Sequence, residues 1–367
     1  MELVPHSFEA GRRGKPDEHD ANIAHLVGQV LLTHDADARF DLDVTGRYRD
    51  GKPLIRIGGE VSEHVRTAEV ARAAAEAVRA YHAAFYDEEP MIEFEWTPQE
   101  ATLSQNGEAG DSGHCIGVAT TASPTREPLE RYLALRIRNR IDELFLAGAV
   151  PGLKADGKVQ VDTLYRGAKP VSIESVIVAA EHAEELALAE LRETIATIIN
   201  EETQPYGAPR HVVINGLGAW HTGGWRTDSG SRHAKAYRDG FATHGCNEDS
   251  LSGEDPSKPG PTGSYLARYL ACRIIDEGLA EYARVHLRYT IGREDVGLHV
   301  VTLGTGKLPQ QELEAFARSQ TRGLRVKDAI RQFDLRNPAL YARVVAASDH
   351  FHLDAPWNGH YRGNVRV

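Results

Sequence analysis

The chain has 367 residues, and at roughly 150 residues per domain this length predicts two or three domains with a substantial core. Its formal net charge of −11 excludes an overall basic surface that would attract nucleic acid or anionic membranes. With 41% hydrophobic and 26% charged residues, the composition is that of a globular protein rather than a disordered or fibrous one.

The cysteines Cys115, Cys246 and Cys272 are odd in number and include no C-x-x-C pair, which argues against a disulfide framework and a thiolate zinc site. The first residues lack the basic segment and apolar core of a signal peptide, and no stretch approaches the ~18 apolar residues of a membrane helix. We therefore expect a cytoplasmic protein.

Hydrophobic periodicity predicts a strand over 40–45, a turn at Asp50-Gly51 and a second strand over 54–57. Residues 64–86 combine good helix formers with an apolar face and predict a helix, and 91–96 predict another strand. The first unit is therefore expected to run strand, strand, helix, strand.

The same order of elements recurs twice. The second copy has strands at 159–163 and 171–179, a helix at 180–200 and a closing strand at 211–215. The third has strands at 285–289 and 298–303, followed by helices near 309–319 and 325–333. Helices at 128–147 and 263–278 lie between the units. The repetition predicts an α+β protein built from three similar units.

The loop Gly11–Asp17 combines glycines, cations and a carboxylate before a helix expected to begin near Glu18. Backbone N–H groups at a helix start, together with Arg and Lys, suit a phosphate, and Asp17 suits a hard metal ion. A solvated surface loop is the alternative. The 17 histidines include no pair at helical zinc spacing, so no zinc site is predicted.

Three more loops have the composition of ligand sites. Gly110–Gly113 places Asp111 between glycines at the entrance of a strand, with a plain turn as the alternative. Gly58-Gly59 would let a ligand approach closely, with Glu60 available to an ammonium group. The polar stretch 247–263 is expected to be an ordered functional loop, with disorder as the alternative.

Taken in order, these segments resemble the S-adenosylmethionine synthetases, or methionine adenosyltransferases, from about Glu9 to Trp357. The motifs are Ile57–Glu60, Ala109–Gly113 with Ala119-Thr120, Asp156–Gln160, Ser252–Lys258, Tyr265–Tyr269, Tyr289–Gly292 and Pro356-Trp357. The resemblance implies three related α+β domains with pseudo-threefold symmetry, which we expect at 1–106, 107–222 and 223–367.

The resemblance also implies the reaction. Members of the family transfer the 5′-adenosyl group of ATP to the sulfur of methionine, which gives S-adenosylmethionine and tripolyphosphate, and then cleave the latter to pyrophosphate and phosphate. Because a thioether has no proton to lose, alignment and cationic groups should provide most of the rate. Mg²⁺ and K⁺ assist, and active sites form between the subunits of a homodimer or homotetramer.

Site roles follow by matching motifs to this sequence. Catalytic roles are implied for Lys15, Lys158, Lys235 and Asp228. Substrate contacts are implied for Glu60, Gln105, Asp111, Asp156, Trp220, Lys258 and Ile291. Asp17 matches a magnesium ligand, and Asp43 stands where the family has a potassium-site Glu.

This sequence departs from the family pattern where the triphosphate should bind. Lys15 replaces a His, Glu18 and Glu254 replace lysines, Ala234 replaces an Arg, and Gly260 replaces a magnesium-binding Asp. These positions are more negative than in the family, and Arg12, Arg13, Arg226 and Arg232 are candidates for compensation. Two alternatives therefore stay open: an adenosyl-transfer enzyme with another nucleophile or adenosine donor, and a non-catalytic subunit that binds adenosine or S-adenosylmethionine.

Overall fold

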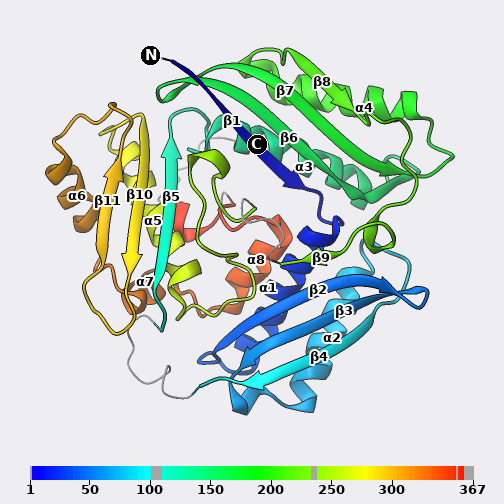
Figure 1. The fold of residues 1–367 in the computed structure, drawn as a ribbon, viewed down its shortest axis with the longest axis horizontal. Helices are drawn as coiled ribbons and strands as arrows, with labels where there is room; N and C mark the ends of the chain where they lie inside the picture. The colour runs from blue at the N-terminus through cyan, green and yellow to red at the C-terminus, as the bar shows by residue number, and fades with distance from the viewer. Residues whose placement is uncertain (1, 101–109, 233–237, 353, 359–367) are drawn as a thin grey trace.

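The computed structural model describes residues 2–100, 110–232, 238–352 and 354–358. Figure 1 shows three sheets placed around the molecule, with helices packed between and behind them. Within the described ranges, no helix has both the length and the apolar character needed to cross a bilayer. The observed architecture is the expected α+β arrangement of three sheet units.

The first sheet has the order β4-β3-β2-β9. Its strands are β2 (Phe40–Arg49), β3 (Lys52–Val61), β4 (Met91–Pro98) and the short β9 (Gly230–Ser231), and its helices are α1 (Pro16–His34) and α2 (Ala68–His82). The antiparallel β2 and β3 are joined at Asp50 and Gly51, whose φ angles of 52° and 81° are those that the predicted turn requires. The expected order of strand, strand, helix, strand is confirmed.

The second sheet has the order β1-β6-β7-β8. Its strands are β1 (Leu3–Gly11), β6 (Leu153–Arg166), β7 (Lys169–His182) and β8 (His211–Ile214), and its helices are α3 (Leu129–Leu146) and α4 (Leu188–Thr203). The helix expected over 180–200 begins only at Leu188. Residues up to His182 still pair with β6, because sheet hydrogen bonds override the helix propensity of this stretch.

The third sheet has the order β11-β10-β5. Its strands are β5 (Gly113–Thr120), β10 (Tyr282–Tyr289) and β11 (Gly297–Val301), covered by α5 (Pro259–Asp276), α6 (Gln310–Ser319) and α7 (Val326–Phe333). A further helix, α8 (Pro338–Ala347), was not predicted and packs on α1.

The sheets do not follow the contiguous ranges 1–106, 107–222 and 223–367. Strand β1 pairs along β6 in the second sheet, and β5 pairs along β10 in the third. Strand β9, from the last range, extends the first sheet. Each range therefore gives one strand to a neighbouring unit.

The third unit contains a very close contact between a sheet and a helix. Helix α5 crosses β5 at Gly117, where a β-carbon would lie 2.0 Å from the backbone nitrogen of Arg268. The side chain of Arg268 is fully buried and donates to the carbonyl of Arg126 at 3.1 Å. Glycine at 117 is thus required by the approach of two backbones.

We expect Gly117→Ala to lower the free energy of unfolding by about 3 kcal/mol, because the added methyl group must push α5 away from β5. Urea denaturation measures this change. The control is Gly58→Ala, where the nearest atoms to a β-carbon lie 3.8 Å away. Equal unfolding midpoints for the two variants would contradict the packing argument.

Candidate active site

Lys15 is the centre of a group of charges at the start of α1. It is the N-cap residue, and its Nζ lies 3.1 Å from Asp17 Oδ2 and 2.9 Å from Asp228 Oδ2. Burial alone would lower the pKa of Lys15, but the contacts with Asp228 and Asp17 raise it above its ordinary value. Lys15 is therefore a permanent cation between two carboxylates.

Asp156, near the start of β6, lies beside this group. Its buried Oδ2 accepts a hydrogen bond from Gly224 N at 2.8 Å. Burial raises the pKa of Asp156 to about 6, against the opposing effects of this bond and of Lys15. Gly224 has a φ of 65°, and a β-carbon there would lie 3.0 Å from the Tyr86 ring, so glycine is needed for this turn.

Asp20 is a carboxylate that the sequence analysis missed. Its Oδ2 accepts from Gly46 N at 2.5 Å, whereas Oδ1 has no hydrogen-bond partner among the described residues. Burial first, and Asp17 and Asp43 in addition, raise its pKa well above the ordinary value. The sequence feature that could have identified Asp20 is its position three residues after Asp17, which places both carboxylates on one face of the helix. Such grouped carboxylate oxygens are donors that a hard divalent cation prefers.

A second group of charges surrounds Asp41 on β2. Arg232 Nη2 lies 2.7 Å from Asp41 Oδ1, and Lys258 Nζ lies 3.2 Å from Asp41 Oδ2. The same lysine lies 3.8 Å from Asp111 Oδ2. Asp41 itself had no role in the sequence analysis. The two expected residues, Lys258 and Asp111, are thus brought together, and Arg232 joins them.

Strand β2 connects the two groups. Asp41 and Asp43 are two residues apart and share the face opposite the buried Leu42 and Val44. Glu60 pairs with Asp41 across the β2 and β3 register and is exposed. One face of the first sheet therefore presents three of the carboxylates next to both groups.

Glu254 and Gly260 are two departures that compensate each other in space. A β-carbon at position 260 would lie 2.7 Å from Glu254 Oε2. The Glu254 carboxyl therefore fills the space that a side chain at 260 would need. Burial, and next the charge of Asp41, raise the pKa of Glu254 to about 8.

Glu18, another departure, is part of a buried network. Arg238 Nε lies 2.9 Å from its Oε2, and Ser348 Oγ donates to its Oε1 at 2.5 Å. Arg138 lies 3.9 Å from Oε1. The acidic charge at 18 is thus balanced by arginines in the interior.

The arginines considered as compensating groups have structural partners. Arg12 is fully buried and donates to Asp142, and Arg13 lies 3.8 Å from the same carboxylate. Arg226 pairs with Glu88. Of the four, Arg232 lies among the expected site residues.

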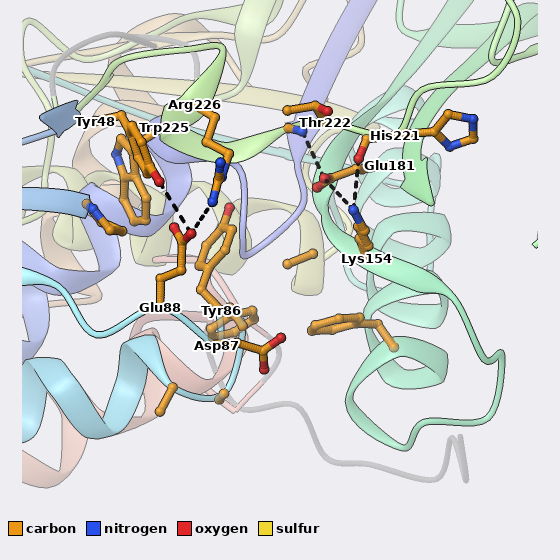
Figure 2. Close-up of a pocket in the computed structure, with 18 of the residues that line it drawn as sticks. Tyr48, Tyr86, Asp87, Glu88, Lys154, Glu181, His221, Thr222, Trp225 and Arg226 are labelled. Atoms are coloured by element: carbon orange, nitrogen blue, oxygen red, sulfur yellow. Dashed lines mark hydrogen bonds and ion pairs between the residues drawn. The ribbon is translucent and has the colours of Figure 1, made fainter. Parts of the chain in front are cut away.

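Arg226 and Glu88 line a cavity of about 550 Å³ between the first and second units. Figure 2 shows this pair on one side of the cavity and Lys154 with Glu181 on the other. Among the residues that the structure describes, none of those given a catalytic, substrate or metal role from the sequence lines it. The segment Gly223-Gly224 separates the cavity from the candidate site. Gly223 N donates to Glu181, which lines the cavity, and Gly224 N donates to Asp156, which belongs to the candidate site.

The other expected residues lie at separate places. Lys158 on β6 lies 2.8 Å from Glu9 on β1, and Trp220 donates from Nε1 to Thr222 O at 2.7 Å. Ile291 is 50% exposed, and its backbone N–H donates to Ser112, next to Asp111. Gln105 and Lys235 lie outside the described residues.

The raised pKa of Asp156 predicts a stability change with pH. Its unfolded-state pKa is ~3.9, so the folded protein binds this proton more tightly and loses stability as pH rises from 4 through 6. We expect Asp156→Asn to be more stable than the wild type by up to about 3 kcal/mol above pH 6, and equal to it below pH 4. Denaturation at several pH values tests this, with exposed Asp50→Asn as control. A pH-independent difference would contradict the assignment.

Comparisons with known proteins agree with the expected family. Residues 106–220 match the central domain and 222–359 the C-terminal domain of S-adenosylmethionine synthetase. The chain is 36% identical over 259 residues to the S-adenosylmethionine synthase of Desulforudis audaxviator, covering 68% of this chain and 64% of that protein, a little under two thirds of its length. It is 34% identical over 278 residues to that of Thermus thermophilus, covering 72% and 69%. It is 28% identical over 384 residues to the S-adenosylmethionine synthase of Clostridium botulinum, and that alignment covers 95% of each chain. The chain therefore belongs to the S-adenosylmethionine synthetase family.

Proposed function

We propose that this protein transfers the 5′-adenosyl group of ATP to the sulfur of methionine and releases S-adenosylmethionine and tripolyphosphate. The main support is that Lys15, Asp17, Asp156 and Asp228 come together from three distant chain segments, in a chain that belongs to the synthetase family. Relatives named S-adenosylmethionine synthase are consistent with this activity.

The chemistry asks for positioning rather than proton transfer. Attack of the thioether sulfur on C5′ forms the C–S bond as the C–O bond to the triphosphate breaks, so charge develops on the leaving oxygens. We assign Lys15 and Lys258 to that charge and, on the resemblance alone, Lys158, which lies apart from both in one chain. Asp228 and Glu60 are assigned to the substrates, and Trp220 provides a flat ring for the adenine. Because Lys15 and Lys258 already pair with carboxylates, the triphosphate must compete with Asp228 and Asp41.

The donor set also fits a magnesium ion. Asp17 and Asp20 offer carboxylate ligands at one group, and Glu254 offers one at the other, in the space of the missing Asp side chain at 260. Bound Mg²⁺ would neutralise phosphate charge.

On the resemblance alone, we assign Asp43 to K⁺ and propose a homodimer or homotetramer with active sites between subunits.

We expect purified protein with ATP, methionine, Mg²⁺ and K⁺ to form S-adenosylmethionine, detected by mass spectrometry.

Lys158→Ala should lower kcat by ~100-fold or more, because it removes a cation from the leaving group. The control is Lys169→Ala, a lysine that is paired with Glu281 and is 71% exposed. Nucleotide binding without any product would favour the non-catalytic alternative, and equal rates for the two variants would overturn the role of Lys158.

The Glu254 carboxyl provides a second prediction. We expect Glu254→Gln to raise the Mg²⁺ concentration needed for half-maximal activity by ~10-fold, because the carboxyl can release its proton and become a charged ligand, whereas the amide cannot. Electron paramagnetic resonance of added Mn²⁺ should show correspondingly weaker binding in the absence of substrates. Glu248→Gln, at the neighbouring acid that accepts from His114 N, is the control. Unchanged Mn²⁺ binding in Glu254→Gln would exclude Glu254 as a ligand.

A further inference from the structure

A cluster of His6, Glu130 and His244 lies where the second and third units meet. His6 is on β1, Glu130 is in the first turn of α3, and His244 ends a short turn at Ala242–His244. One ligand atom from each residue lies within 4.8 Å of the others. The three positions are too far apart in the sequence to form a recognisable motif, and neither the proposed reaction nor the family motifs use them.

Glu130 is arranged like a ligand with a supporting shell. Its carboxylate is fully buried, and Oε2 accepts from Thr163 Oγ1 at 2.9 Å and from Tyr165 OH at 3.0 Å. The other oxygen, Oε1, lies 3.0 Å from His244 Nε2. Within the described part of the chain, neither of these two buried atoms makes a hydrogen bond of acceptable geometry. The two buried atoms therefore contact each other at 3.0 Å without a well-formed hydrogen bond.

His6 is the third residue of the cluster and lies nearer the surface than Glu130 and His244. Its Nδ1 lies 2.8 Å from Thr243 Oγ1, so a ring that donates from Nδ1 keeps its lone pair on Nε2. Its ring stacks on His244 with 3.9 Å between centroids.

We propose that His6, Glu130 and His244 bind a divalent transition metal ion, of which zinc fits best, with water as the fourth ligand. Two imidazoles and one carboxylate are a known zinc donor set, and tetrahedral ligands at ~2.1 Å from the ion are ~3.4 Å apart. The Glu130 and His244 atoms are already near that separation, and the ring of the half-buried His6, whose ligand atom lies within 4.8 Å of both, would turn away from its stack to bind. Thr163, Tyr165 and Thr243 supply the outer shell that orients such ligands.

The ion would join three separate segments. It would connect the edge strand β1 to α3 and to the segment from residue 238 to α5, which contains His244. The backbone of that segment is already held at His244 O, which accepts a hydrogen bond from Arg284 Nη1 at 3.3 Å. The expected role is therefore structural, and it is independent of the proposed adenosyl transfer.

The test is titration of chelator-treated full-length protein with ZnCl₂, followed by calorimetry in excess Mg²⁺ so that the active-site carboxylates are occupied. We expect one zinc per chain to bind the wild type, and His6→Ala to weaken that binding by more than ~10-fold. The half-exposed His6 can be removed without opening the core. The matched control is His286→Ala, from a histidine pair in which His286 Nε2 lies 3.2 Å from His114 Nδ1, and it should bind as the wild type does.

Thermal unfolding gives a second, independent measure. Zinc should raise the Tm of the wild type and of His286→Ala by the same amount, and raise that of His6→Ala by less at the same zinc concentration. Added Co²⁺ should give the intense visible absorption of a four-coordinate site in the same two proteins only. If the wild type takes up no zinc in excess Mg²⁺, or if His6→Ala binds it equally well, the proposal is wrong and Glu130 with His244 is an ordinary buried ion pair.

Discussion

The buried guanidinium of Arg12 holds together the segments on which the candidate site depends. Its Nε donates to Asp142 of α3 at 2.8 Å, and its Nη1 donates to the carbonyls of Lys154 and Asp156 on β6. Its own backbone N–H bonds Gly157 O at 2.9 Å. Because Arg12 is three residues before Lys15, this anchor fixes the start of α1 against β6. Loss of one partner would leave an uncompensated charge in the interior, which typically costs about 3–5 kcal/mol.

The departures from the family pattern divide into two kinds. Glu18 faces inward, and its charge is matched by Arg238 and Arg138, so it changes the core rather than the substrate region. Glu254 remains among site residues, and its carboxyl takes the room that opens at Gly260. A count of charges along the sequence treats both acids as losses at the triphosphate. In the folded chain only Glu254 lies among the candidate-site residues, so the two acids add less negative charge there than the sequence comparison implied.

Local signals were sufficient for much of the fold. Period-two alternation around Asp50-Gly51 predicted the β2 and β3 hairpin, and the apolar face of α2 predicted that helix. The start of α4 was placed too early because residues 180–187 are good helix formers, and only pairing with β6 keeps the first of them in β7. Strand β1 was missed because its partner lies about 150 positions later, where no local pattern reveals it. The motifs named Lys15, Asp156 and Lys258 as candidates, whereas the proximity of Asp41 to Lys258 and the anchoring role of Arg12 depend on three-dimensional contacts.

The exchange of strands between units has a consequence for how the chain is made. As the polypeptide leaves the ribosome from its N-terminus, β1 has no partner until residue 158 has emerged and β5 has none until residue 282, and their pairing is complete only at residues 166 and 289. Both stay as unpaired edges during synthesis, the state in which chains tend to associate wrongly. These long-range pairs join the three units to one another, and a fragment cut at either boundary in the sequence would lack a strand that its sheet requires.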